Sequence, residues 1–453
     1  MRRTGWLWLV ISSALIASLA AETRPQYGGT ARVAIKESLT SLDPGDDAQG
    51  DSFARRGITL LLFDTLVNID QGGRIQPSLA ASWTAQGNRH WQFHLRRGVK
   101  FHDGTPLSAE IVAASLRTAN PAWTISAEGE TVTIEVESSG ASLLAELARP
   151  RNAIAKRSSD LVPSGTGPFR IVDWQAGKKL TLAAAEDYWR GRPYLDGVEI
   201  EMGRSYRDQM TALDLGKSDL VEVPAEQIHR ASLEGHRLSS SLPVELVALV
   251  FSTEATSPDE KSLREALALS IDRGSIRNVL LQGAGQPAGG ILPNWMSGYE
   301  FVFQTNADLA AARHMREQVR TVPTWKLGYD GSDPVARLMA ERIALNAKDA
   351  GLSLQPTTSE TVELRLVRIM LASGDPWTAL EAVAASRSLP PTKGSGRGIE
   401  DLYAAEQSAL ASRRLIPLFH LPETYAAGSA LRNWGLSSSG GFDLADAWLG
   451  SKQ

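Results

Sequence analysis

The side chains with the widest chemical range in this chain are its seven histidines, three of which lie close together in the sequence. His90, His94 and His102 would be natural ligands for a metal ion if their rings met. Residues 90–95 alternate like a strand, which would place His90 and His94 on one face but about 13 Å apart. Because that distance is too long for one ion, we predict no metal site here.

Catalytic motifs are also missing from the sequence. It contains no G-x-S-x-G elbow and no H-E-x-x-H zinc motif. The glycine-rich stretch 283–290, GAGQPAGG, lacks the lysine and the Ser or Thr of a phosphate-binding loop. We therefore expect a protein that is not an enzyme and that carries no cofactor.

Composition narrows the function further. The 453 residues include 47 basic and 51 acidic side chains, a net charge of -4, which argues against a nucleic-acid binder. Forty-three per cent of the residues are hydrophobic, enough to bury large cores, and the length suggests two to four domains. The absence of cysteine excludes disulfides, thiolate metal sites, cysteine nucleophiles and lipid attachment at an N-terminal cysteine.

The first 20 residues are predicted to be a secretory signal peptide. They begin with Arg2 and Arg3, continue with an apolar run from Trp6 to Leu19, and end in small residues. The alternative is an uncleaved membrane anchor, although the run is shorter than the ~20 residues of a spanning helix. We expect a periplasmic or secreted protein that is not a lipoprotein.

The elements that would position a site alternate between strands and helices. Residues 31–35, 91–95 and 131–136 fit strands, and 244–251 is a nearly continuous apolar run typical of a buried strand. Residues 58–70 are apolar enough for a buried helix, and Ser257-Pro258 and Asp333-Pro334 are good helix starts. The pattern indicates a mixed α/β fold with several lobes.

Five short segments give a more specific indication than the overall composition does. They are residues 101–110, 165–170, 187–193, 264–273 and 285–288, which read FHDGTPLSAE, GTGPFR, DYWRGRP, REALALSIDR and GQPA. In this order they resemble the extracytoplasmic solute-binding proteins of the dipeptide, oligopeptide and nickel class, family 5, which serve ABC importers. The resemblance runs from about Tyr27 to Leu449. We interpret the glycines in these segments as structural, since glycine allows tight turns.

The resemblance implies an α/β periplasmic-binding-protein fold of type II, with two lobes and an extra inserted domain. After the signal peptide (1–20), lobe I would combine residues 21–45, 181–252 and 420–453. The inserted domain would be 46–180 and lobe II 253–419. The chain would cross between the lobes near Val250–Thr253 and His420–Glu423, and a ligand touching both lobes would favour the closed state.

The resemblance identifies the residues that would contact a ligand less directly than it identifies the fold. Members of the family use an acidic anchor for a ligand's amino group, and in this chain the corresponding region is condensed, with Asp375 as a loose match. Trp295 and Trp377, in turn-rich parts of lobe II, are candidates for lining the cleft and stacking on a ligand. Tyr425 and Trp434, near the return to lobe I, are further candidates. For each aromatic residue, packing inside its own lobe is the alternative.

These features predict a monomeric solute-binding protein that captures a short peptide or other small molecule and delivers it to an ABC permease in the membrane. Alternatives on the same scaffold are a nickel, opine or sugar carrier, or a ligand-sensing partner of a membrane receptor.

Overall fold

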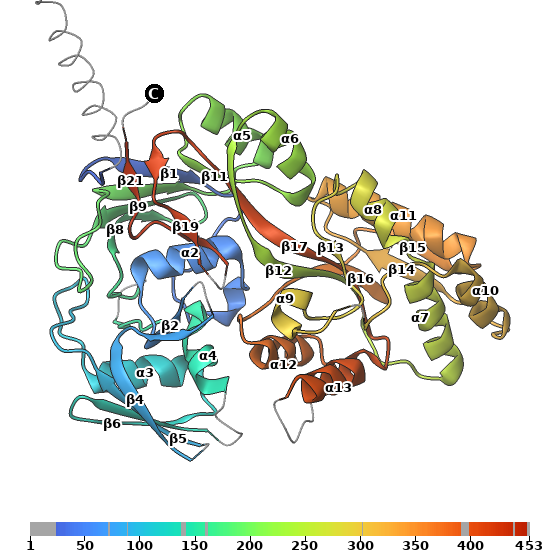
Figure 1. Cartoon of the computed structure of the whole chain (residues 1–453), viewed down its shortest axis with the longest axis horizontal. Helices are drawn as coiled ribbons and strands as arrows, with labels where there is room; N and C mark the ends of the chain where they lie inside the picture. The colour runs from blue at the N-terminus through green and yellow to red at the C-terminus, as the bar shows by residue number, and fades with distance from the viewer. Residues whose placement is uncertain are drawn as a thin grey trace, which may run out of the picture.

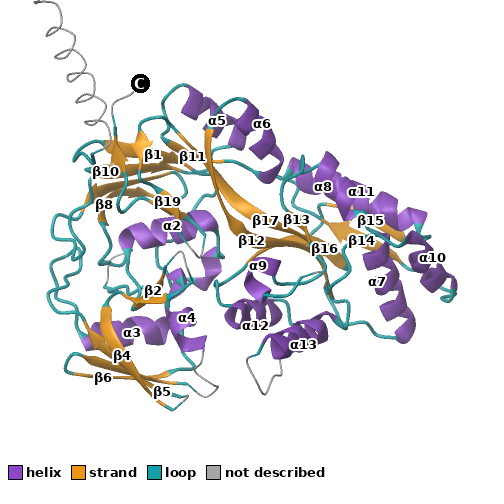
Figure 2. Ribbon diagram, viewed as in Figure 1, coloured by secondary structure: helices purple, strands orange, loops and turns teal. Residues whose placement is uncertain are grey.

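The computed structural model describes residues 24–70, 73–87, 89–136, 142–158, 162–300, 302–390, 398–437 and 440–450. The predicted signal peptide lies outside these residues. Strands and helices alternate along the described chain, so the mixed α/β fold class is confirmed (Figure 2). Across the same residues, no helix combines the length and the apolar character needed to span a membrane.

One large mixed sheet forms the backbone of the molecule. Its strands, in spatial order, are β15 (Ser353–Thr357), β14 (Thr324–Gly328), β16 (Leu364–Met370), β12 (Arg237–Phe251), β17 (Leu415–Ala427), β11 (Leu220–Glu222), β1 (Thr30–Ala34), β10 (Gly197–Glu201), β9 (Lys179–Ala184) and β8 (Phe169–Gln175). A short strand, β13 (Gln286–Pro287), also pairs with β17. We call the part built on β8–β11 and β1 the first lobe, and the part built on β14–β16 the second lobe.

Two long antiparallel strands, β12 and β17, run through both lobes (Figure 1). The end of β17 pairs with β11 in the first lobe, and the end of β12 pairs with β16 in the second. The register of the pair shifts between Ser240 and Glu245, around Pro243, which has no backbone N–H to donate. This irregular stretch lies opposite Leu421–Thr424, so both strands change lobes there.

The first crossing therefore lies earlier than we expected. Val250 is paired on both sides, with Arg365 on β16 and Leu415 on β17, so the expected crossing at Val250–Thr253 falls well inside the second lobe. The expected second crossing, His420–Glu423, overlaps the irregular stretch.

The second lobe covers its sheet with helices on both faces. One face carries α7 (Pro258–Ser270), α8 (Arg273–Val279), α10 (Leu309–Glu317) and α11 (Pro334–Asp349), and the other carries α9 (Asn294–Ser297), α12 (Pro376–Ser386) and α13 (Ile399–Leu410). Along β12, Val247 and Leu249 enter the first of these cores while Leu246 and Ala248 enter the second. This two-sided burial confirms the prediction from the apolar run 244–251.

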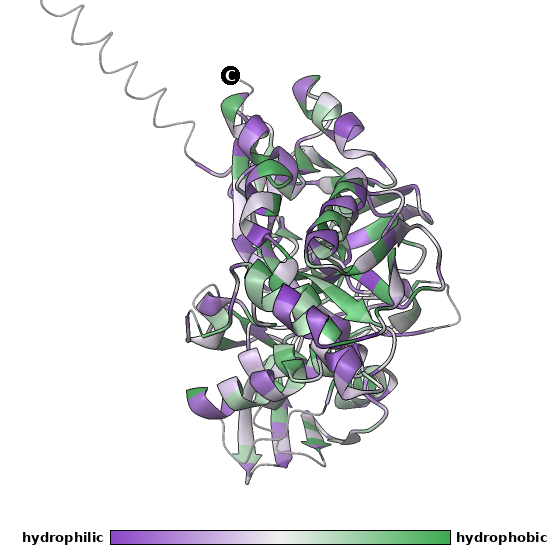
Figure 3. Ribbon diagram, turned by 90° about the vertical axis from the view of Figure 1, so that its right-hand side faces the viewer, coloured by the Kyte–Doolittle hydropathy of each residue, from purple (hydrophilic) through white to green (hydrophobic). Residues whose placement is uncertain are grey.

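Helix starts follow the predicted capping signals. The side chain of Ser257 accepts a hydrogen bond from the Glu260 N–H at 3.1 Å, and α7 begins at Pro258. Asp333 caps α11 in the same way, with Pro334 at its first position. Most helices carry hydrophobic and hydrophilic residues side by side, as expected where one face packs on a sheet (Figure 3).

The first lobe buries its sheet against α2 (Phe53–Leu62) and the end of the chain. The remaining short elements around it are α5 (Tyr206–Asp214), α6 (Ile228–Leu233), the 3-10 turns Asp47–Gln49 and Ala225–Gln227, and the two ribbons β18 (Leu431–Arg432) with β21 (Trp448–Leu449) and β19 (Gly435–Leu436) with β20 (Phe442–Asp443). The prediction of one helix over 58–70 was wrong in its bounds. The helix ends at Leu62, and residues 67–69 form β2.

A smaller unit hangs below the first lobe in Figure 1. Its antiparallel sheet has the order β4 (Ala80–Gln86), β5 (His90–Leu95), β7 (Thr131–Glu135) and β6 (Thr124–Glu128). Around this sheet lie a two-stranded ribbon, β2 (Val67–Ile69) with β3 (Ile75–Pro77), and two helices, α3 (Ala109–Ala119) and α4 (Leu143–Leu147). A 3-10 turn, Pro150–Asn152, completes the unit. Its own core extends from Leu66 to Ile154. Since α2 and β8 contribute to the first lobe, the domain limits 46 and 180 stay a prediction.

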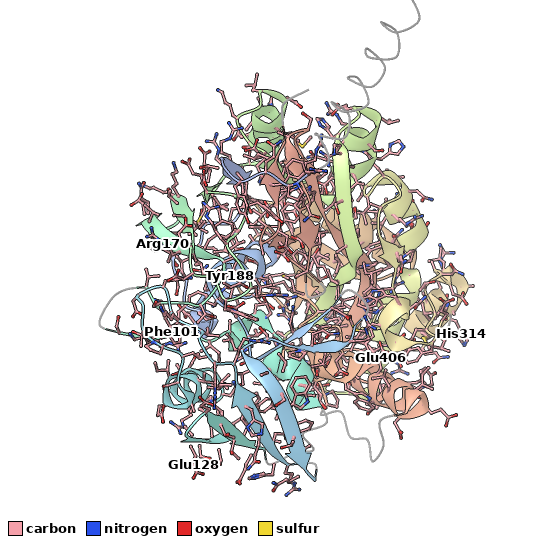
Figure 4. The ribbon with its side chains drawn as sticks, turned by 60° about the vertical axis from the view of Figure 1, so that its left-hand side comes forward. Phe101, Glu128, Arg170, Tyr188, His314 and Glu406 are labelled. Atoms are coloured by element: carbon pink, nitrogen blue, oxygen red, sulfur yellow. The ribbon has the colours of Figure 1, made fainter. Side chains whose placement is uncertain are left out.

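A buried carboxylate joins the small unit to the first lobe. Asp64 accepts hydrogen bonds from Thr166 Oγ1 at 2.9 Å, Trp189 Nε1 at 2.9 Å and Tyr188 OH at 3.0 Å. Burial raises the pKa of Asp64. Two of the five segments, GTGPFR and DYWRGRP, therefore meet at one side chain. Phe101, Arg170 and Tyr188 line a small cavity at the same junction (Figure 4).

The glycines of the GTGPFR segment allow the chain to approach α2 closely. A Cβ at Gly165 would lie 1.9 Å from the carbonyl oxygen of Leu62, and one at Gly167 would lie 2.5 Å from the Leu62 carbonyl carbon. The Gly167 N–H donates to the same Leu62 oxygen at 3.0 Å. This contact supports the structural interpretation of these glycines.

Gly165→Ala is expected to destabilise the protein by roughly 2–4 kcal/mol, because the new methyl group would overlap backbone atoms that cannot rotate away. The measurement is the free energy of unfolding in urea. The control is Gly274→Ala on the exposed side of α8, where a Cβ would meet no atom closer than 3.5 Å. Equal stability of the two variants would contradict the prediction.

Candidate functional site

A cavity of about 410 Å³ lies between the two lobes, beside the irregular stretch of β12 and β17. The first lobe contributes Lys36, Glu37, Asp51, Ser52, Phe53, Ala54, Tyr206 and residues 222–225; the second contributes Glu245, Asp330, Ser332, Arg368 and Met370; and β17 contributes Leu421, Pro422, Glu423 and Thr424. We call this cavity the cleft. Its residues come from both lobes and from the strands that connect them, so it would change shape with any movement of the lobes.

The cleft is rich in carboxyl groups. Among the described residues, six carboxyl groups line it, on Glu37, Asp51, Glu222, Glu245, Asp330 and Glu423, against two cations, on Lys36 and Arg368. Arg368 Nη1 lies 3.5 Å from Glu245 Oε2, and that carboxylate raises the pKa of Arg368. The Lys36 ammonium lies 5.1 Å from the centre of the Tyr206 ring. Asp51 is ion-paired with Arg56, which does not itself line the cleft. Four carboxyl groups, on Glu37, Glu222, Asp330 and Glu423, have no ion-pair partner among the described residues. This surplus of carboxyl groups favours a positively charged ligand.

Two of the carboxylates are held by the first lobe. Glu222 Oε2 accepts hydrogen bonds from the backbone N–H of Lys36 at 2.6 Å and from Gln209 Nε2 at 3.1 Å. Glu37 accepts a hydrogen bond from the hydroxyl of Ser52, the residue that caps α2. Burial raises the pKa of both carboxyl groups. Their positions are therefore fixed before any ligand arrives.

Glu423 is the most deeply buried carboxylate of the cleft, with 7% of its surface exposed. Its Oε2 accepts a hydrogen bond from the Gly441 N–H at 2.7 Å. Burial raises the pKa of Glu423 to about 8, although hydrogen bonds from the Tyr425 hydroxyl and the Gly441 N–H act in the opposite direction. A buried carboxyl group is a strong acceptor for an ammonium or guanidinium group.

The candidates predicted in the second lobe lie outside the cleft lining. Asp375 caps α12, where its Oδ2 accepts hydrogen bonds from the N–H of Thr378 at 2.9 Å and from its hydroxyl at 2.7 Å. Trp377 packs in the core under α12, 7% exposed. Trp295 is 37% exposed, and its Nε1 donates to the Pro243 carbonyl at 2.8 Å. Trp295 therefore contacts the strand crossing without lining the cleft.

The candidates near the chain end also pack inside the protein. Tyr425 is fully buried in the first-lobe core, and Trp434 meets it edge to face with ring centres 6.4 Å apart. The structure thus brings these two rings together but leaves both out of the cleft lining. The role of all five predicted residues in ligand contact stays a prediction, and the cleft geometry favours a different set.

Sequence reasoning missed the charged residues of the cleft. A usable signal existed for two of them. Glu423 interrupts the apolar strand LIPLFHLPETYAA, and Glu222 stands between apolar neighbours in LVEV. Burying a charged side chain in a strand costs free energy unless the charge is paired or hydrogen-bonded, so such a residue is a candidate for ligand contact. Arg368 and Asp330 gave no such signal, because they reach the cleft only through the order of the strands.

The histidines stand apart from the cleft. Of the seven, all within the described ranges, none is among the cleft-lining residues. His420 Nε2 lies 3.0 Å from the carbonyl of Ile291, and burial lowers its pKa to about 4. His90 and His94 each contact a neighbouring strand residue, Glu135 and Thr131. The described part of the chain holds no group of three His, Asp or Glu side chains that could bind a metal ion.

Comparison with known proteins then decides the family. Residues 74–368 match the family described as "Bacterial extracellular solute-binding proteins, family 5 Middle". The chain belongs to this family. Its matches are substrate-binding transport proteins and not enzymes.

Individual relatives carry different ligands in their names. The "Nickel-binding protein NikA" of Staphylococcus aureus is 29% identical over 240 residues, which are 50% of this chain and 49% of that protein. A dipeptide-binding protein from Pseudoalteromonas sp. SM9913, solved with Met-Leu, has a TM-score of 0.80 at 18% identity and covers 93% of this chain and 100% of its own. The binding protein AgaA of A. tumefaciens R10, solved with agropinic acid, has a TM-score of 0.79 at 19% identity, covering 94% and 99%.

None of these similarities identifies the ligand of this protein. The solved structures, at such low identity, support the fold alone. The chain spans 49% to 66% of the length of the first curated relatives that it matches. The ligand of this protein must therefore be argued from its own cleft.

The buried carboxyl of Glu423 is expected to make stability depend on pH. Its folded pKa, about 8, lies above its ordinary value of 4.5. Between these values the unfolded chain loses the proton while the folded protein keeps it, so stability falls as pH rises from 5 to 8. Glu423→Gln removes the titrating group and with it this loss of stability. The change in the free energy of unfolding that the substitution causes should therefore be more favourable at pH 8 than at pH 5 by roughly 2–4 kcal/mol.

The measurement is urea unfolding of the ligand-free protein at both pH values. Glu341→Gln, on the exposed face of α11, is the matched control and should follow the unmodified protein at each pH. If Glu423→Gln showed no gain at pH 8, the carboxyl would already be ionised in the folded state.

Proposed function

We propose that this protein is an extracytoplasmic solute-binding protein that captures a small ligand with a positively charged group, most simply a short peptide, and delivers it to an ABC permease. The observation that carries the proposal is the carboxylate-rich cleft between the two lobes. Membership of a family of extracellular solute-binding proteins supports the same function. The protein acts as a monomer, and the predicted signal peptide directs it across the membrane.

The chemistry of the cleft suits a peptide ammonium group. The buried carboxyl group of Glu423 supplies an acceptor, and the carboxyl groups of Glu222 and Glu37 line the same cavity. A cation bound there would stabilise the ionised form of Glu423 and lower its pKa. A cavity of about 410 Å³ lies in the range of small-molecule sites, and bridging water would let it accept varied side chains.

The two lobes supply the means of closure. They are joined by β12 and β17, and residues from both lobes face the cleft. Arg56 on α2 reaches across and donates from Nη2 to the Leu371 carbonyl of the second lobe at 3.0 Å. A ligand that contacts both sides binds the closed form better than the open form, and therefore shifts the population toward closure.

Nickel is the main competing ligand, because one relative is named as a nickel-binding protein. The cleft offers carboxylates but no histidine. A peptide with a free amino group therefore fits its residues better than a bare nickel ion, which imidazole suits well. A rise in melting temperature with Ni²⁺ that a chelator abolishes would favour nickel instead.

The most direct test is native mass spectrometry of the protein purified without denaturation. We expect a bound mass that fragments as a short peptide or another amine, and a melting temperature that rises with its concentration. An empty protein whose melting temperature no member of a dipeptide and tripeptide library shifts would overturn the peptide assignment. Hydrolysis of the bound peptide on incubation would contradict a transport role.

The charge of the cleft gives a sharper prediction. Ala-Leu amide, which has one ammonium group and no carboxylate, should bind, and its N-acetyl derivative should not. Glu423→Gln should weaken the binding of Ala-Leu amide by about tenfold or more. Arg368→Gln should strengthen it, because it removes a like charge from the same cavity. Isothermal titration calorimetry measures all three.

Glu341→Gln again serves as the control, with unchanged affinity expected. Equal binding of the acetylated and free amides would show that the ammonium group is not recognised. Weaker binding in both cleft variants would point to a general loss of shape and not to a charge effect.

A further inference from the structure

The second lobe contains a larger cavity, of about 590 Å³, that shares no residue with the cleft. It lies between the end of α7, the segment 302–306, helix α13 and the start of β17. We call it the outer cavity. Its position within one lobe means that closure of the two lobes does not form it.

The outer cavity exists because β17 has an open edge where it begins. β12 pairs with one side of Ile416 and Pro417, whereas β13 reaches the other side only at Phe419 and His420. Helices α7 and α13 belong to the cores on opposite faces of the sheet. Where they extend past this open edge, none of the described strands fills the space between them.

An arginine occupies the open edge in place of a strand. Arg273 is 3% exposed, and its Nε and Nη2 donate to the Pro417 carbonyl at 3.1 and 2.8 Å. Its Nη1 donates to the Ala268 carbonyl at 3.2 Å. Among the described residues, no carboxylate lies within ion-pair distance of it. A buried cation that is bonded only to carbonyls keeps its full charge, which attracts an anion.

The remaining charges of the cavity do not neutralise Arg273. Arg413 forms a two-point ion pair with Glu265 on α7, so two guanidinium groups and one carboxylate line the space. Burial, together with the nearby charge of Arg413, lowers the pKa of Arg273 to about 10. Glu406 on α13 is used elsewhere, accepting the Leu292 N–H at 2.9 Å (Figure 4).

The rest of the lining is mainly apolar. Phe303 and Tyr403 face each other with ring centres 5.4 Å apart, and Leu269 and Leu410 add aliphatic surface. We propose that the outer cavity is a second binding site, for a small amphipathic anion: a monocarboxylate with an aromatic or branched aliphatic body. The carboxylate would bind beside Arg273 and Arg413, and the body would pack on Phe303, Tyr403 and Leu410.

The test uses 4-phenylbutyrate as the anion and 4-phenylbutan-1-ol as its uncharged analogue, each titrated into the full protein by calorimetry. We expect saturable binding of the acid and at least about tenfold weaker binding of the alcohol. Ala404→Trp places a large ring on the exposed cavity wall of α13 and should weaken binding of the acid by about tenfold or more.

Ala385→Trp, at an exposed position of α12 outside the outer cavity, is the matched control and should bind the acid as the unmodified protein does. Unfolding curves of both variants check that the lobe is intact. Binding of the acid that is equal in the two variants would overturn the site. Binding of the alcohol as tight as that of the acid would overturn the role of the arginines.

Discussion

The pairing of β12 with β17 is the constraint on which the rest of the molecule depends. Each strand is hydrogen-bonded along both lobes, so neither lobe has a complete sheet without the other's strands. The register of the pair shifts on both sides of Pro243, where the strands pass between the lobes, and once more between Val247 and Ala248 inside the second lobe. We expect any movement of the lobes to be absorbed by the few residues around Pro243, as in other hinged proteins. The cleft lies beside this stretch.

The same strand order explains the charge of the cleft. Arg368, Glu245, Glu423 and Glu222 lie on β16, β12, β17 and β11, four neighbours in one sheet with strands about 4.8 Å apart. Glu222 and Glu423, which are 201 positions apart in the sequence, are thus held on adjacent strands of one sheet. Keeping carboxyl groups in such a buried row costs stability in the empty protein. Under the proposed function, a bound cation would offset that cost, so ligand affinity and stability would be coupled.

The sequence predicts more of the fold than of the ligand-binding site. The apolar run 244–251 and the proline-led helix starts are local signals, and the structure follows them. The helix over 58–70 was misplaced because Asp64, just after α2, is held by side chains about a hundred residues away. Asp375 looked like an anchor, yet its carboxylate is used to cap α12. Glu423 and Arg368 reach the same cleft only because their strands belong to one sheet. A single sequence does not reveal which strands pair.

The placement of β17 also bears on how the chain is made. Strand β1, at residues 30–34, lies between strands from 197–201 and 220–222, and the latter strand closes against residues 425–427. Because residues 425–427 complete the sheet of the first lobe, a growing polypeptide cannot finish that core until those residues have been synthesised. Such non-local pairing is slow to form. If the predicted signal peptide directs export, this delay would keep the chain unfolded for its passage across the membrane.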